Sequence, residues 1–367
     1  MGIRAKRRTR KLFRLCAPLV LCLNAGCSSH NAPSPETRLD LVPFLDGSQM
    51  NPFLTVRLTF LDEDKLLATV GGQDAKGVVI GLNDRKVMRT IPLGDCYVMR
   101  VWRTADSHLV VFCRDHLMTY DAAFQKQAEL KLDNWAPTVE VSPDGKLFTL
   151  DSGRYAQDHA RKSKFQPSYF LYDADSLKQL QGNLPEGFTP ITDNGSIVVK
   201  DDRVYFLPFA GGEPTQIFTA RPHSYVFPEV LAENRIVLEM TPIRSSVVVD
   251  YSGAIVYPIA RWPGNLAVEQ SSASGTRFLM AFEGRTTLYA LSQVPADLLG
   301  ADERPNIAIF DVLDSLSGKQ LFDVSWRIQS DPVFGRALEA VAALSEDGRL
   351  LAAIRGRSLE IYRVSGN

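Results

Sequence analysis

The chain has 367 residues, of which 45% are hydrophobic and 23% are charged. This balance is typical of a soluble globular protein and excludes disorder over most of the length. The 41 Lys and Arg residues nearly match the 42 Asp and Glu residues, so the formal net charge is only -1. Such a charge gives no general affinity for nucleic acid or acidic surfaces, and any electrostatic recognition must be local.

The N-terminus has the pattern of a secretory signal. A cluster of Lys and Arg residues between Arg4 and Arg14 precedes the apolar run from Leu15 to Leu23. This run is shorter than the roughly 20 residues that a membrane-spanning helix needs. It therefore indicates the basic and apolar regions of a signal peptide, and we expect residues 1–26 to be removed on export.

The apolar run leads into Leu23-Asn24-Ala25-Gly26-Cys27, where small residues directly precede a cysteine. This segment resembles the lipobox of bacterial lipoproteins, in which the cysteine carries fatty acyl chains such as palmitate and becomes the mature N-terminus. The resemblance implies acylation of Cys27, although Asn24 stands where the lipobox usually has a leucine-like residue. A non-lipidated signal peptide is the alternative, and a twin-arginine route through Arg7-Arg8 is conceivable.

The same resemblance implies a location. Ser28 follows the cysteine, whereas an aspartate there retains many lipoproteins in the inner membrane. We therefore expect a cell-envelope protein that is anchored by lipid to the outer membrane of a two-membrane cell and faces the periplasm. The segment 27–37 is rich in Ser, Asn and Pro, and we expect it to be a flexible tether between the lipid and the folded body.

Only two cysteines remain in the expected folded body. Cys96 opens one strand-like run, Cys113 closes the next, and a polar turn at residues 103–106 joins the two runs. In a hairpin centred on Thr104-Ala105, the two cysteines would face one another within the separation that a disulfide needs. An oxidising periplasm favours this disulfide, and two free buried thiols are the alternative.

From residue 38 onward, short β-rich runs alternate with turns, and almost no stretch has a helical period. The repeating unit is clearest around Ser142-Pro143-Asp144-Gly145 and around Ser345-Glu346-Asp347-Gly348. Weaker copies lie at residues 58–70, 191–199 and 273–282. The glycine in each turn has a physical reason, because tight hairpin turns need a positive φ that glycine accepts freely.

These turns, each followed by a hydrophobic strand and then a strand ending in tyrosine, resemble the WD40-like or YVTN-type β-propeller repeat of bacterial envelope proteins. We predict an all-β fold in which residues 38–367 form one propeller domain. The last unit supplies only three strands, so we expect the run Arg38 to Phe44 to pair with it and close the ring. The spacing predicts seven blades, with six or eight as alternatives, near residues 53–93, 96–132, 137–183, 186–219, 223–260, 264–325 and 333–364.

No catalytic pattern is present in the sequence, since the chain has neither a Gly-x-Ser-x-Gly turn nor a phosphate-binding loop. The histidines are not spaced as metal ligands on one strand or helix, and two cysteines are too few for a cysteine-rich zinc site. Carboxylates such as Asp62-Glu63-Asp64 and Asp201-Asp202 fall in predicted turns, where solvated turn chemistry explains them. We therefore expect no enzyme activity, no metal and no cofactor.

Two insertions depart from the minimal blade, a basic one at residues 152–167 and an acidic one at residues 291–305. Each falls between the second and third strands of its unit, and loops at this position share one face of a propeller. Long loops on a rigid scaffold often bind partners, and solvated loops without a ligand are the alternative. The candidate partner-binding residues are Arg154, Tyr155, His159, Arg161, Lys162, Lys164 and Phe165, with Arg355 and Arg357 of the equivalent loop in the last unit.

The leading interpretation is a non-enzymatic, monomeric scaffold that binds a protein or an envelope polymer and no nucleic acid. It resembles, in general plan, the propeller lipoproteins that support outer-membrane assembly. The alternative is a propeller lactonase or hydrolase with a metal or acid-base site at the central channel, because such sites draw residues from several blades. The four tryptophans lie near predicted blade ends, where packing explains them better than a sugar-binding platform.

Overall fold

The computed structural model describes residues 33–41, 56–104, 106–132, 139–151, 169–184, 190–231, 234–241, 245–259, 267–272, 274–285, 306–328 and 341–365. The chain separates into two compact units, Met1–Ser34 and Pro35–Asn367, and the fold below is that of the second. Every named element in the described residues is a strand. No helix within these ranges has the length and apolar character needed to cross a bilayer.

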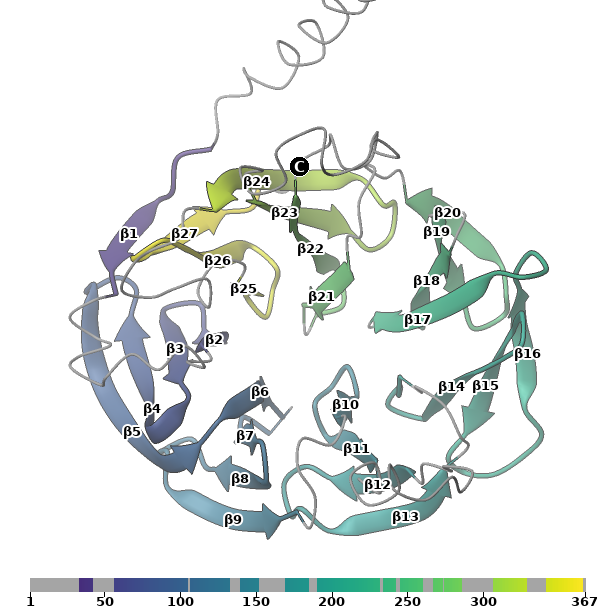
Figure 1. The fold of residues 1–367 in the computed structure, drawn as a ribbon, viewed down its shortest axis with the longest axis horizontal. Helices are drawn as coiled ribbons and strands as arrows, with labels where there is room; N and C mark the ends of the chain where they lie inside the picture. Colours follow the sequence, from purple (N-terminus) through teal and green to yellow (C-terminus); the bar gives the residue numbers. More distant parts are fainter. Residues whose placement is uncertain are drawn as a thin grey trace, which may run out of the picture. The chain divides into compact units, whose positions relative to one another are not determined.

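The strands form seven antiparallel sheets arranged as the blades of a ring (Figure 1). Blade 1 contains β2 (Val56–Asp62), β3 (Lys65–Val70), β4 (Gly72–Gly81) and β5 (Lys86–Cys96). Blade 2 contains β6 (Val98–Arg103), β7 (Leu109–Cys113), β8 (His116–Tyr120) and β9 (Lys126–Lys131). Blade 3 contains β10 (Val139–Val141), β11 (Leu147–Asp151), β12 (Tyr169–Asp173) and β13 (Gln179–Leu184).

The second half of the ring repeats this plan. Blade 4 contains β14 (Gly195–Lys200), β15 (Arg203–Pro208) and β16 (Thr215–Thr219), with an isolated bridge from Ile191 to Ser196 at its inner edge. Blade 5 contains β17 (Tyr225–Leu231), β18 (Arg235–Thr241), β19 (Ser245–Asp250) and β20 (Ile255–Ile259). Blade 6 contains β21 (Ala267–Ser271), β22 (Arg277–Arg285), β23 (Asn306–Asp314) and β24 (Gln320–Ile328). Blade 7 contains β25 (Ala342–Leu344), β26 (Leu350–Arg355), β27 (Ser358–Arg363) and the N-terminal strand β1 (Thr37–Asp40).

The hydrophobic core lies between neighbouring blades. Middle strands such as β7 are buried on both faces and are therefore apolar throughout, whereas the outer strand β9 alternates between exposed and half-buried residues. One buried cluster joins blades 1 and 2, another joins blades 4 and 5, and the remaining blade pairs are joined in the same way. Trp102 and Trp326 belong to such clusters, whereas Trp135 and Trp262 lie outside the described residues.

The N-terminal strand closes the ring, as the sequence predicted. β1 runs antiparallel to β27, with Arg38 opposite Glu360, and Leu39 and Leu41 are buried in the cluster that joins blades 7 and 1. The last residues of the predicted closing strand, 42–44, lie outside the described residues. The seven-blade prediction is confirmed, because the long sixth unit forms a single four-stranded sheet.

The repeated Ser-x-Asp-Gly turns have a common hydrogen-bond pattern. In the β10–β11 turn, the Ser142 hydroxyl lies 2.7 Å from the Asp144 carboxylate, which also accepts the Lys146 N–H. Ser345, Asp347 and Arg349 repeat these contacts in blade 7. Gly145 and Gly348 adopt φ values of 73° and 72°, so glycine is required at the end of each motif.

Cys96 and Cys113 form a disulfide with a Cα–Cα distance of 5.1 Å, but its setting differs from the predicted one. Val98, rather than Cys96, lies opposite Cys113 in the β6–β7 hairpin, and a bulge follows between Val98 and Arg100. Cys96 instead ends β5, where it pairs with Gly72. The disulfide therefore joins blade 1 to blade 2 and does not cross-link a single hairpin.

Candidate functional site

The loops fall on two edges of the ring because antiparallel strands alternate in direction. We call the edge that carries the connections between the second and third strands of each blade the loop face. In the described residues it includes 114–115, 201–202 and 356–357, together with the strand ends that flank residues 152–168, 242–244 and 286–305. We call the edge that carries the other turns within the blades the turn face.

The strands that flank the two predicted insertions end or begin on the loop face. The basic insertion connects β11 to β12, and the acidic insertion connects β22 to β23. These two segments, and with them the candidate residues Arg154, Tyr155, His159, Arg161, Lys162, Lys164 and Phe165, lie outside the described residues.

The remaining two candidates form the turn between β26 and β27. Arg355 and Arg357 are both exposed, and Gly356 between them has a φ of 59°. The Arg355 guanidinium lies 5.9 Å from the centre of the Trp326 ring, an arrangement that allows a cation–π contact. The Arg357 carbonyl accepts a hydrogen bond from the Leu41 N–H at 2.8 Å. The turn is thus held by the closing strand and presents two arginines on the loop face.

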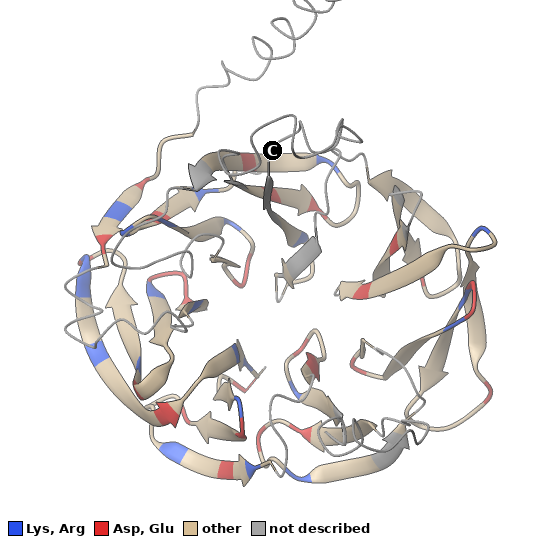
Figure 2. Cartoon of the chain, viewed as in Figure 1, with Lys and Arg blue, Asp and Glu red and all other residues tan. Residues whose placement is uncertain are grey.

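Many acidic residues lie at turns between strands (Figure 2), where they stabilise the turns themselves. Asp62, predicted to be a turn carboxylate, accepts hydrogen bonds from the Asp64 N–H and the Lys65 ammonium. The Ser252 hydroxyl and nearby backbone N–H groups hold the pKa of Asp250 below its usual value. These carboxylates cap turns, as the sequence indicated.

Two carboxyl groups have raised pKa values that the sequence did not reveal. Partial burial, together with the neighbouring carboxyl of Asp144, raises the pKa of Asp193 to about 6. Burial and the cross-strand Asp323 raise the pKa of Asp311 to about 6. Perturbed carboxyls often mark functional sites, but these two lie in blades 4 and 6 and do not form one acid-base pair.

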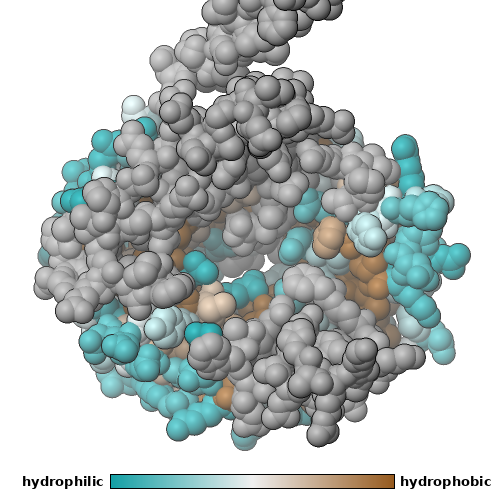
Figure 3. All heavy atoms as spheres, in the orientation of Figure 1, coloured by the Kyte–Doolittle hydropathy of each residue, from teal (hydrophilic) through white to brown (hydrophobic). Residues whose placement is uncertain are grey.

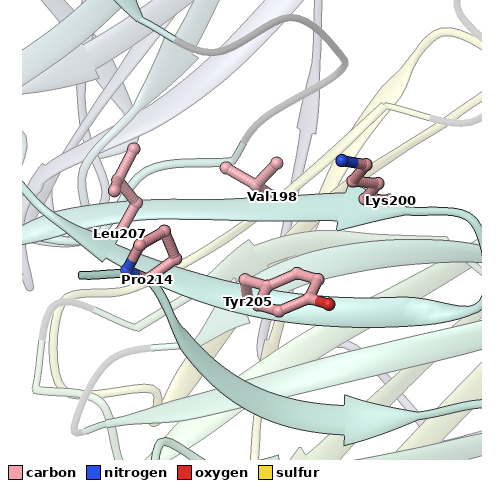
Figure 4. Close-up of a pocket in the computed structure, with 5 residues that line it drawn as sticks. All are labelled: Val198, Lys200, Tyr205, Leu207 and Pro214. Carbon is pink, nitrogen blue, oxygen red and sulfur yellow. The ribbon is translucent and has the colours of Figure 1, made fainter.

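A cavity of about 350 Å³ lies on one side of blade 4. Val198 and Lys200 of β14, Tyr205 and Leu207 of β15, and Pro214 before β16 line it. Figure 4 shows the Lys200 ammonium and the Tyr205 hydroxyl toward one end of the cavity, with Leu207 and Pro214 toward the other. Apolar walls with a few polar groups suit binding of a ligand.

An exposed aromatic pair lies on the inner strand of blade 5. Tyr225 is 73% exposed and Phe227 is 50% exposed, whereas Val226 between them is buried against blade 4. Because alternate residues of a strand point to opposite faces, the two rings lie on the face of β17 turned away from blade 4. In Figure 3, hydrophobic atoms lie inward of a mostly hydrophilic outer rim.

Comparison with known proteins gives a likeness in fold only. No family model matches the chain, and no curated protein matches it. A solved structure described as "Crystal Structure of Mitotic Checkpoint Complex" is similar over 92% of this chain and 98% of the matched chain, with 13% sequence identity and a TM-score of 0.53. The matched chain is also a WD40 propeller. The protein therefore has the fold of a WD40-like, seven-bladed β-propeller.

Proposed function

We propose that the protein is an outer-membrane lipoprotein whose propeller binds a protein, or an envelope polymer, through the loop face. The lipobox-like sequence ending at Cys27 supports the lipid anchor. The tether leads directly into β1, which is paired along β27 as the outer strand of blade 7. A tether between the lipid and the ring would hold the propeller near the membrane.

The observation that carries the proposal is the position of the insertions. Both long insertions connect the second and third strands of their blades, and the exposed Arg355-Gly356-Arg357 turn connects the same strands of blade 7. The strand ends that flank both insertions and the turn of blade 7 therefore lie on one edge of the ring. Several loops on one face of a rigid scaffold provide a contiguous recognition surface.

A hydrolytic function has less support. Neither Asp193 nor Asp311 lines the cavity on blade 4, and a hydrolase would need its acid-base groups within reach of one bound substrate. The exposed arginines, by contrast, suit bidentate recognition of carboxylate or phosphate groups on a partner. A binding role is therefore the function that we propose.

The loop-face proposal can be tested by charge reversal. Wild-type protein and the double variant Arg355→Glu/Arg357→Glu would be used to capture partners from detergent-solubilised membranes, with quantitative mass spectrometry as the measurement. We expect the amount of each specific partner captured by the variant to fall at least tenfold. Each arginine that becomes a glutamate replaces an attractive contact with a repulsive one, at a cost of about 1 kcal/mol or more in binding free energy. Lys178→Glu/Lys319→Glu is the matched control, since both lysines are exposed on the turn face. Equal losses in both variants would contradict the proposal, as would hydrolysis of a lactone or ester with no specific partner captured.

The anchor has its own test. Changing Cys27 to Ser removes the thiol that would accept the lipid and leaves every described residue intact. Each buried CH₂ of an acyl chain contributes about 0.8 kcal/mol of membrane affinity. We expect the wild type to fractionate with membranes and to carry a lipid-sized mass increment at Cys27, whereas the variant lacks the increment. A soluble wild type with a free N-terminus at another residue would rule out the lipobox interpretation.

A further inference from the structure

We propose that Cys96, Cys113 and His116 form a binding site for one Zn²⁺ ion when the disulfide between the two cysteines is reduced. One ligand atom from each of the three residues lies within 4.8 Å of the other two. Both cysteines are fully buried, and the His116 side chain is 14% exposed. Two thiolates and one imidazole are a ligand set that zinc prefers.

The fold explains why these residues meet. Cys113 ends β7 and His116 begins β8, so the two residues flank the short turn that connects these strands. Cys96 ends β5 of the neighbouring blade. All three therefore come from the ends of strands at the interface between blades 1 and 2. Rigid strand ends hold ligands more accurately than loops do, and in the reduced protein the metal would cross-link the same two blades that the disulfide joins.

A neighbouring carboxylate, Asp115, orients the His116 imidazole for metal binding. His116 Nδ1 lies 2.7 Å from Asp115 Oδ1. With the proton on Nδ1, His116 donates to the carboxylate, and its Nε2 lone pair is left to bind a metal. Metal-ligating histidines usually make such a hydrogen bond through the second ring nitrogen, because it fixes the tautomer and the ring orientation. A water molecule would be the fourth ligand of a tetrahedral Zn²⁺ ion.

An external dithiol would be the reductant of the disulfide. The dithiol gives two electrons and two protons, the Cys96–Cys113 bond breaks, and the reductant becomes a disulfide. When Zn²⁺ binds, the two thiol protons pass to solvent, two sulfur–zinc bonds form, and the Nε2 lone pair of His116 forms a third bond. Oxidation by a disulfide of higher potential would restore the bridge and release the ion. The same three side chains would thus be either a structural disulfide or a metal site.

The test uses the full chain with Cys16, Cys22 and Cys27 changed to Ser, so that Cys96 and Cys113 are the only cysteines. Co²⁺ serves as the spectroscopic probe. The protein is reduced with a phosphine, freed of reductant and titrated with Co²⁺, in parallel with the oxidised protein. We expect the reduced protein to bind one equivalent of Co²⁺ with a thiolate-to-cobalt charge-transfer band that Zn²⁺ removes, and the oxidised protein to show no such band.

Variants separate this site from two thiols acting alone. His116→Ala should weaken Co²⁺ binding at least tenfold, and Asp115→Asn should weaken it by about ten- to a hundredfold, as for other carboxylates that orient ligands. His108→Ala is the matched control. His108 Nδ1 makes a similar 2.7 Å contact with Asp175, but His108 precedes β7 at the end opposite to Cys113. We expect this control to bind Co²⁺ as the wild type does.

Thermal unfolding keeps the proposal testable if reduction destabilises the protein. Zn²⁺ should raise the unfolding midpoint of the reduced wild type, since binding to the folded state alone is stabilising. It should not raise the midpoint of the oxidised protein and should raise that of reduced His116→Ala much less. The proposal is overturned if the reduced wild type shows neither the band nor the shift, or if His116→Ala behaves like the wild type.

Discussion

We expect Arg38→Met to lower the free energy of unfolding by about 2 kcal/mol. Arg38 of β1 lies 2.5 Å from Glu360 of β27, whose side chain is only 1% exposed. Tyr362 donates a second hydrogen bond to the same carboxylate. Breaking a fully buried ion pair costs about 3–5 kcal/mol, and losing a hydrogen bond to a charged group costs about 1.5–3 kcal/mol. The lower range applies because Arg38 itself is 58% exposed, so water partly replaces it.

Two further variants isolate the cause. Glu36 and Arg363 form a second ion pair next to β1 and β27, but both side chains are exposed, so Glu36→Gln should have a clearly smaller effect. Adding Glu360→Gln to Arg38→Met should restore part of the lost stability, since it removes the uncompensated buried charge.

Urea unfolding followed by tryptophan fluorescence would measure these differences, and hydrogen exchange of the β27 amides would report whether the ring opens at β1. Equal losses of unfolding free energy in Arg38→Met and Glu36→Gln would rule out the buried charge as the cause. Failure of Glu360→Gln to restore stability to Arg38→Met would rule it out as well.

Three other predictions concern stability and use urea unfolding as the measurement. Gly145→Ala should lower the free energy of unfolding by roughly 3 kcal/mol, because the new Cβ would lie 2.1 Å from the Arg103 carbonyl oxygen at a φ of 73°. Gly94→Ala is the control, since Gly94 has a φ of 72° but nothing within 4 Å of the new Cβ, and it should cost only about 1 kcal/mol. Equal losses in the two variants would contradict the clash. Asp311→Asn should stabilise the protein by about 1–2 kcal/mol at pH 7 and hardly at pH 4. Asp311 has a folded-state pKa of about 6, above its value in the unfolded chain, so the wild type loses stability as the pH rises from about 4 to 6. A gain in stability that is independent of pH would contradict this. Cys113→Ala should lower the free energy of unfolding by about 3 kcal/mol under oxidising conditions, because the disulfide restricts the unfolded chain by closing a loop with a sequence separation of 17. A loss below about 1 kcal/mol would argue against this origin of the stability.

The sequence predicted the ring well because its turns carry specific requirements. Asp144-Gly145 and Asp347-Gly348 mark hairpins whose serine, aspartate and glycine each have a defined role in the turn. Two clear and three weaker copies of this turn could be recognised in the sequence, and their spacing predicted the blade count. The missing strand of the last blade predicted closure by β1, because an open ring would leave edges unpaired.

The register of the cysteines could not be predicted in the same way. The sequence shows two strand-like runs and a turn, but not where the turn is centred. The β6–β7 hairpin is centred on Asp106, with Arg103 opposite Leu109, so Cys113 meets Val98 and not Cys96. Cys96 ends β5 in the preceding blade, and its nearness to Cys113 arises from contact between blades. For the same reason, spacing along the chain gave no indication that His116 would lie beside both cysteines.

The exposed aromatic pair shows why the surface of a blade is harder to predict than the fold. Tyr225, Val226, Phe227 and Pro228 alternate between exposed and buried positions, and a strand with such a pattern is normally half-buried. The pattern identifies two faces but does not tell which face a neighbouring blade covers. Here the face with Val226 packs on blade 4, so the large rings are left on the other side. A strand that buries its aromatic residues and a strand that exposes them therefore have the same alternation, and only the packing of adjacent blades distinguishes them.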